Sequence, residues 1–145
     1  MKAEITTFLK QVEGELLKQY TSRNLRASGK FGNELREEAT ETEGTIFASG
    51  HARQMINGRK PGPLPPVQAI EDWIHAKGLD LNPWAVAKSI AKKGTTIFRG
   101  RQGLDVSEAV GKYSDAFMIV LSREKAEVIQ ARIAESFKKA QEALV

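Results

Sequence analysis

The sequence predicts an α+β fold, in which a small antiparallel sheet or hairpin is packed by several helices, with long helices at the N- and C-terminal ends. Three observations predict it. Apolar residues recur at three- and four-residue steps over 3–20 and again over 122–140. Residues 34–48 combine alternating and β-branched positions around a Gly-containing turn. The stretch 59–94 holds all five prolines, both tryptophans and two further amphipathic runs. At this length we expect a single domain over 1–145.

The N-terminal third is expected to form a helix, a loop and a hairpin. One apolar stripe marks the helix over 3–20, and the glycines of 27–32 indicate a loop. The charged stretch 34–40 is expected to be an edge strand that pairs with 45–48 through a turn at 42–44. The stripe of the helix consists of Ile5, Phe8, Leu9, Val12, Leu16 and Tyr20.

A short helical turn is predicted to end at Asn57-Gly58, before a proline-rich strap over 61–66. Proline fixes φ and lacks an amide donor, so this strap can be neither interior helix nor paired strand. A helix is expected to follow over 66–77, ended by Gly78.

Another helix is expected over 82–93, with Asn82 as its N-cap and Pro83 in its first turn. Each of these two helices carries one tryptophan on its apolar stripe. The sequence therefore predicts Trp73 and Trp84 as core anchors that pack against each other, rather than as a platform for stacking bases.

The C-terminal third is predicted to be mostly helical. Thr95 to Phe98 has the composition of a short strand, and 99–103 that of an exposed, mobile basic loop. The apolar run within 113–121 fits either a buried strand or a helix, and the helical spacing around it favours helix. Ser122 is expected to cap the last helix, whose stripe comprises Ala126, Ile129, Ile133, Phe137 and Ala140.

Several functional classes are disfavoured by composition. The chain has no cysteine, which excludes disulfides and thiol catalysis and fits an intracellular site of synthesis. It shows no secretory signal and no apolar run near the ~20 residues that span a bilayer. His51 and His75 lack metal-ligand spacing, and no nucleophile and base converge. We therefore expect no enzyme activity, no metal, no cofactor and no membrane association.

Charge is concentrated in the middle of the chain. The net charge is +4, but residues 51–103 carry nine bases against three acids, while both flanking parts are close to neutral. A basic face of this kind suits a polyanion or an acidic protein partner, although a solvated surface explains it equally well.

A helix-turn-helix-like unit over 66–94 is one functional alternative, and it would make the protein a small DNA-binding regulator. The second helix would place Lys88, Lys92 and Lys93 on phosphates. That exposed face lacks the Arg, Asn and Gln side chains that read bases.

The central region also resembles a known family. Over about 40 residues it is similar to the head–tail joining (neck or tail-completion) proteins of tailed bacteriophages and prophages. The blocks that carry the resemblance are Ile56-Asn57-Gly58-Arg59-Lys60-Pro61-Gly62, Pro65-Pro66, Ile70-Glu71-Asp72-Trp73-Ile74, Lys77-Gly78-Leu79 and Ala85-Val86-Ala87-Lys88-Ser89-Ile90-Ala91-Lys92-Lys93-Gly94-Thr95.

The resemblance implies a non-enzymatic virion protein, made in the host bacterial cytoplasm, that assembles into a homo-oligomeric ring between portal and tail. Its partners would be the portal or connector and the tail proteins, with possible non-specific contact to packaged DNA. We expect the basic residues of the middle region to face these partners or the lumen, namely Arg59, Lys60, Lys88, Lys92, Lys93, Arg99 and Arg101.

Overall fold

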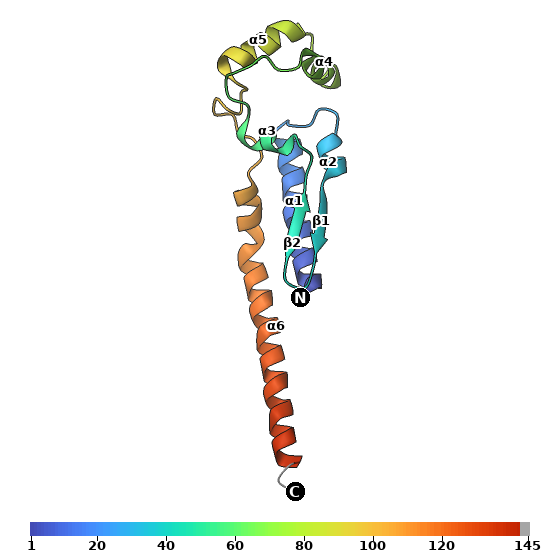
Figure 1. Cartoon of the computed structure of the whole chain (residues 1–145), viewed down its shortest axis with the longest axis vertical. Helices are drawn as coiled ribbons and strands as arrows, with labels where there is room; N and C mark the ends of the chain where they lie inside the picture. Colours follow the sequence, from blue (N-terminus) through green and yellow to red (C-terminus); the bar gives the residue numbers. More distant parts are fainter. Residues whose placement is uncertain (143–145) are drawn as a thin grey trace.

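The N-terminal helix lies at the centre of a slender molecule, between a hairpin and a very long C-terminal helix (Figure 1). The computed structural model describes the backbone of residues 1–142 and the side chains of residues 1–135. The chain forms, in order, α1 (Lys2–Ser22), α2 (Lys30–Glu34), β1 (Arg36–Ala39), β2 (Gly44–Phe47), α3 (Ala52–Asn57), α4 (Val67–Ala76), α5 (Pro83–Lys93) and α6 (Val106–Glu142). The predicted α+β class is confirmed, with long helices at both ends.

The apolar stripe of α1 forms a large part of the core. Val12, Leu16 and the neighbouring stripe residues are buried, and α6 packs along one side of the helix. Phe8 of α1 stacks on Phe117 of α6 with ring centroids 4.4 Å apart. Ala109, which is fully buried, joins Val12 and Leu16 in one of the two core clusters.

The predicted hairpin is present and covers another side of α1. The strands are antiparallel, with Arg36 opposite Phe47 and Glu38 opposite Thr45. These four residues form the exposed outer face, while most of the alternate positions are half-buried toward α1. The turn is closed by Thr40, whose amide donates to the carbonyl of Glu43 at 2.8 Å.

α6 is a single helix of 37 residues, so the run 113–121 is helical, as the flanking spacing favoured. The predicted cap at Ser122 is wrong, because its hydroxyl donates to the carbonyl of Met118 within the continuous helix. The helix begins earlier, where Asp105 accepts from the amide of Glu108 at 2.9 Å. Phe137 and Ala140 of the predicted stripe lie outside the residues whose side chains are described.

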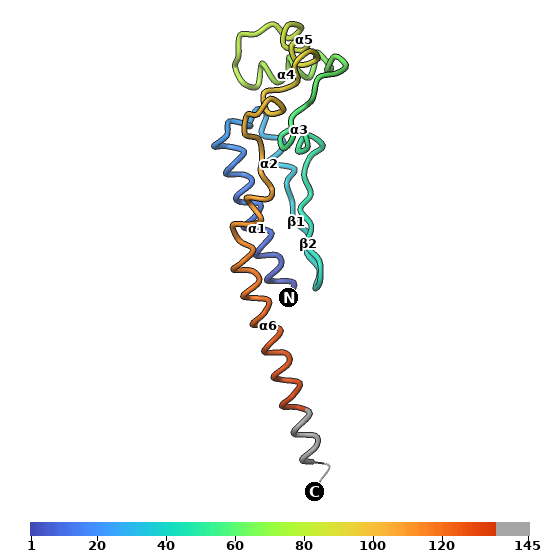
Figure 2. Tube along the Cα trace, turned by 90° about the vertical axis from the view of Figure 1, so that its left-hand side faces the viewer, coloured from blue at the N-terminus to red at the C-terminus, as the bar shows by residue number. Residues whose placement is uncertain are grey.

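The two central helices form a small head above the rest of the molecule, which we call the body (Figures 1 and 2). We define the head as residues 58–93, which comprise the strap 61–66 with the segment that leads into it, α4, α5 and the loop between these helices. α4 and α5 pack chiefly on each other. Asn82 caps α5 as predicted, accepting from the amide of Ala85 at 3.1 Å. The strap forms neither helix nor strand, also as predicted.

Two local predictions fail in the connecting segments. Thr95 to Phe98 is a turn rather than a strand, since the amide of Arg99 donates back to the carbonyl of Thr95 at 3.1 Å. The predicted loop 27–32 already contains the start of α2. In both places a local hydrogen-bonded turn satisfies backbone groups that have no neighbouring strand to pair with.

Candidate interaction surfaces

Residues 58–62 and 91–95, which lie far apart in the sequence, meet at the base of the head. The amide of Thr95 donates to the carbonyl of Arg59 at 2.9 Å, and the hydroxyl of Thr95 accepts from the amide of Arg59 at 2.9 Å. One turn away, the amide of Gly62 donates to the carbonyl of Ala91 at 2.9 Å. The strap is therefore fastened along the C-terminal end of α5.

Two glycines make this fastening possible. Gly58 has φ 68°, and a Cβ built there would lie 2.3 Å from the amide nitrogen of Phe98. Gly94 has φ 75°, and its Cβ would lie 2.7 Å from the carbonyl oxygen of Arg59. Both positions combine left-handed backbone with a close backbone approach, so a side chain is excluded on two grounds.

The seven predicted basic contact residues all lie in the head or in the loop that follows α5. Lys60 is brought close to Lys92 and Lys93 by the fastening of the strap, and Lys88 lies one turn along the same helix. All of them are exposed except Arg59, which is half-buried. Lys60, Lys88, Lys92 and Lys93 therefore form a basic surface around the C-terminal half of α5.

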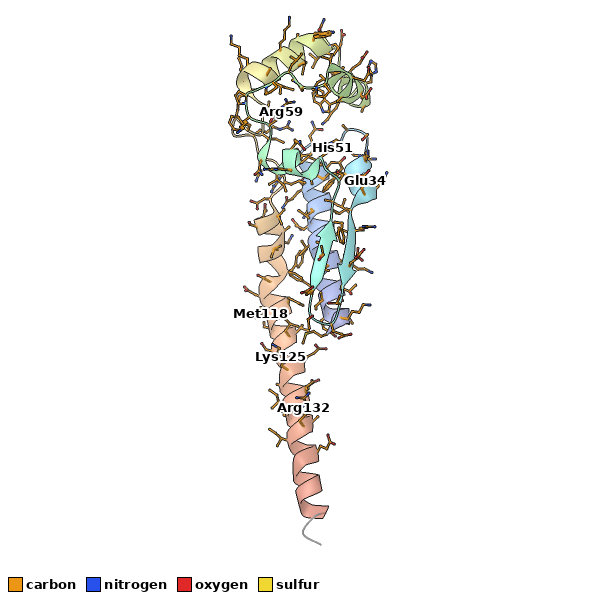
Figure 3. The ribbon with its side chains drawn as sticks, viewed as in Figure 1. Glu34, His51, Arg59, Met118, Lys125 and Arg132 are labelled. Atoms are coloured by element: carbon orange, nitrogen blue, oxygen red, sulfur yellow. The ribbon has the colours of Figure 1, made fainter. Side chains whose placement is uncertain are left out.

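Two of these seven cations also have structural roles. Arg59 lies at the base of the head, shortly after α3 (Figure 3), and its guanidinium donates to the carbonyl of Pro63 at 2.7 Å. Arg101 donates to the carbonyl of Arg23 at 2.9 Å, at the end of α1. The predicted loop 99–103 is exposed only as far as residue 102, since Gly103 is buried.

Lys77 links the head to the body through hydrogen bonds. Its ammonium donates to the backbone carbonyl of Asn24 at 2.6 Å and to the side-chain oxygen of the same residue at 3.0 Å. Partial burial, assisted by the nearby Arg101 guanidinium, lowers the pKa of Lys77.

The prediction that the tryptophans anchor the core is wrong. Trp73 is 39% exposed and Trp84 is 57% exposed. The interior between the two helices is filled instead by the smaller Ile74 and Ala87, which are buried. A pair of short helices has only one shared face, and an indole beside that face remains in contact with water.

The least expected surface is an apolar stripe along α6. We define the α6 stripe as the residues that recur at alternating three- and four-residue steps on one side of this helix, namely Ile119, Ser122, Ala126, Ile129 and Ile133. Its three isoleucines are between 51% and 62% exposed. The sequence indicated the stripe from 126 onward, and α6 continues past the end of the body and leaves this stripe uncovered (Figure 1).

The hairpin presents the opposite charge. Residues 34–43 contain five glutamates and one arginine. A hollow of about 480 Å³ lies beside the hairpin, and its lining includes Glu37, Glu38 and Glu43 together with Lys2. Burial, with a hydrogen bond to Glu37 as the next cause, raises the pKa of Glu13 beneath the hairpin, and the same hydrogen bond lowers the pKa of Glu37.

Among the described residues, no three His, Cys, Asp or Glu side chains gather as metal ligands would. No helix within the described part of the chain has both the length and the apolar character to cross a membrane.

Comparison with known proteins gives no further guide. A scan against models of protein families, a search of curated proteins and a search of solved structures each found no match to this chain. Function is therefore inferred from the residues and their geometry.

Proposed function

We propose that this protein is a virion structural protein of a tailed phage or prophage. It is a head–tail joining subunit, of the neck or tail-completion type, that assembles into a ring between portal and tail. It acts through shape and contact, without catalysis, and its partners are copies of itself, the portal or connector, and tail proteins.

The observation that carries this proposal is the uncovered α6 stripe. Single exposed apolar residues are ordinary on a protein surface, but a row of them on a helix that extends beyond the body marks an association surface. The amino nitrogen of Met1 lies 3.5 Å from a carboxylate oxygen of Glu124, and the part of α6 after this residue, which includes Ile129 and Ile133, extends beyond the N-terminus of α1 (Figure 1). An assembled state covers them.

The head adds a second and different surface. It carries Trp73 and Trp84 on its outside, and aromatic residues of this kind are enriched at protein interfaces. Two unlike surfaces at separate places on one subunit suit heterologous contacts, in which one patch meets a different patch of the next molecule. Heterologous contacts close into rings when the rotation between subunits allows it.

The basic surface around α5 suits the lumen of such a ring. Lys88, Lys92 and Lys93 are exposed cations on one helix, and phosphate contacts of this type hold DNA without reading its sequence. The same residues are compatible with docking to an acidic face of a neighbouring virion protein.

The test is to locate the protein in phage particles and to delete its gene. We expect averaged images of intact particles to show a ring of this subunit at the neck. Particles made without it should accumulate as filled heads and separate tails. Purified particles that lack the protein, or a deletion that leaves infectious particles unchanged in number, would overturn the proposal.

A DNA-binding regulator is the second candidate, and the exposure of Lys88 and Lys92 on one side of α5 is the observation that favours it. In that case an isolated monomer or dimer would prefer one duplex sequence over others at physiological salt. Binding that is independent of sequence, with a steep salt dependence, supports the lumen role instead.

A further inference from the structure

The side of α6 that carries the stripe faces away from its own body. With about 100° between successive helical residues, the stripe lies opposite Tyr113 and Phe117, which pack against the body near α1. Met118, which borders the stripe, is 59% exposed. No described element of the same chain covers this surface.

The charges at the edges of the stripe are positive from residue 123 onward, while the exposed Asp115 lies in line with the stripe, one helical turn before Ile119. Arg123, Lys125 and Arg132 fall on its two edges, and Figure 3 labels Lys125 and Arg132 along the helix. The glutamates of this part of α6 fall on other sides of the helix, at positions 124, 127 and 135. The surface is therefore apolar in the middle and basic at the edges, which calls for an acidic partner.

A second α6 stripe is a poor partner for this surface. Packing stripe on stripe would bring Arg123 and Lys125 of one copy close to the same cations of the other copy along one seam. Like charges at such flanking positions oppose association and select for a different partner.

The outer face of the hairpin has the complementary character. It carries Glu38 and the half-exposed ring of Phe47, whose face lies 4.8 Å from the guanidinium carbon of Arg36. The lining of the adjoining hollow includes three glutamates and one lysine, Lys2. An exposed aromatic side chain on a hairpin with an excess of glutamates over its one arginine matches an apolar stripe edged by cations.

The hairpin and the upper part of the stripe also lie at the same height on the molecule. The amino nitrogen of Met1 is 3.8 Å from a carboxylate oxygen of Glu41, at the hairpin tip, and 3.5 Å from one of Glu124, on α6. The hairpin and α6 pack on different sides of α1 (Figures 1 and 2). Copies placed side by side therefore bring the hairpin of one beside residues 118–126 of the next.

We propose that the upper part of the α6 stripe docks onto the outer face of the β1–β2 hairpin of a second copy of this chain. Arg123 and Lys125 then approach the glutamates of the partner hairpin, while Ile119 and Ser122 lie over its strands. This contact deepens the proposed function and rests on it, because it is a heterologous contact of the kind a ring requires.

Disulfide trapping tests this contact cleanly, because the chain has no cysteine of its own. One preparation carries Thr45→Cys on the hairpin and the other carries Ser122→Cys on α6, both at exposed positions. The full-length variants are mixed and oxidised. A disulfide requires Cα atoms within about 7 Å, so only a real approach of the two surfaces is trapped.

The matched control replaces Ser122→Cys by Glu127→Cys, an exposed residue on the same helix but away from the stripe. We expect the 45–122 product to form at least about tenfold faster than the 45–127 product, because docking raises the effective concentration of the two thiols. Unchanged helix content and melting temperature check that each variant is folded.

Charge exchange gives a second readout. Arg123→Glu with Lys125→Glu should abolish the 45–122 product, as should Glu38→Lys with Glu43→Lys, and mixing the two charge-reversed partners should restore it. Preferential 122–122 linkage, no linkage in any mixture, or linkage that ignores charge reversal would overturn the contact. None of these results decides the location of the protein in particles, so failure of the contact is distinguishable from failure of the proposed function.

Discussion

Single glycines decide how closely the strap approaches the loop after α5. At Gly58 and Gly94 the backbone of another segment occupies the space that a side chain would take. The nearby prolines restrict the strap further, because each one fixes φ. Backbone chemistry at a few residues thus sets the position of the whole head.

Replacing Gly58 by alanine should destabilise the protein by about 1–3 kcal/mol, since left-handed strain and a clash with Phe98 act together. Gly14→Ala is the matched control, because Gly14 is exposed on α1 and a Cβ there would meet nothing within 4 Å. That change should stabilise α1 by roughly 0.5–1 kcal/mol. Chemical unfolding followed by circular dichroism measures both, and equal effects of the two substitutions would contradict this account of the strap.

The ion pair between Glu15 and Lys112 should make stability depend on pH. Lys112 donates to the Glu15 carboxylate at 2.6 Å, and this hydrogen bond lowers the pKa of Glu15. A lowered folded-state pKa gives a contribution that is full above the ordinary glutamate pKa, roughly 4.3, and is lost as the pH falls through the folded-state value. The gap in unfolding free energy between wild type and Glu15→Gln should therefore narrow on acidification.

The comparison for this pair is Glu127→Gln, which alters an exposed glutamate on α6. Its effect should stay small at every pH. The raised pKa of Glu13 changes the pH dependence of stability in the opposite direction. This contribution is the same in wild type and in Glu15→Gln, so it cancels in the difference between their unfolding free energies. A gap that widens toward low pH would contradict the assignment.

At the scale of elements, α1 is the support on which both the hairpin and α6 depend. Leu16 is 6% exposed and lies in the core cluster that joins α1 to Ala109 of α6. Leu16→Ala should cost about 2–5 kcal/mol, the usual range for a large-to-small change in a core. Urea unfolding measures this, and Leu81→Ala, at an exposed site in the head, should change stability far less.

The outer side of α5 should govern contact with DNA. Reversing charge with Lys88→Glu and Lys92→Glu should weaken binding to duplexes of any sequence and flatten its salt dependence, because fewer counterions are released. Fluorescence anisotropy across a salt series measures the slope. The control variant is Glu71→Lys, on α4. We expect the head of this variant to keep its fold, and its α5 cations are unchanged. Affinity unaffected by reversal on α5 would remove the lumen role for this surface.

At the scale of the whole molecule, the essential property is that two unlike surfaces, the α6 stripe and the hairpin, are held on different sides of α1. The α6 stripe is edged by cations, and the hairpin carries an excess of glutamates. Charge therefore favours contacts between different surfaces of neighbouring copies over contacts between identical ones.

Self-association should accordingly weaken as sodium chloride is added, since the screening length falls from about 10 Å at 0.1 M to about 3 Å at 1 M. Light scattering or sedimentation over a concentration series provides the measurement. A variant with Arg123→Gln and Lys125→Gln should associate more weakly at low salt and respond less to added salt. Association that strengthens with salt in the wild type would point to burial of apolar surface without a charge contribution.

Much of the local structure was predictable from the sequence. The stripe of α1, the hairpin around Gly44, the cap at Asn82 and the proline strap all depend on spacing or turn chemistry within a short window. The basic surface was predicted as a set of residues. The fastening of the strap by Thr95 was not, because it joins residues far apart in the chain.

Burial was decided by the tertiary structure alone. Apolar periodicity marks a face that another surface will cover, but it does not say whether that surface belongs to the same chain. For α1 the cover comes from α6 and the hairpin, whereas Trp84 and the α6 stripe have none within the described chain. The sequence by itself determined which faces are apolar; which of them remain open to a partner depended on the long-range packing that set α6 beyond the body.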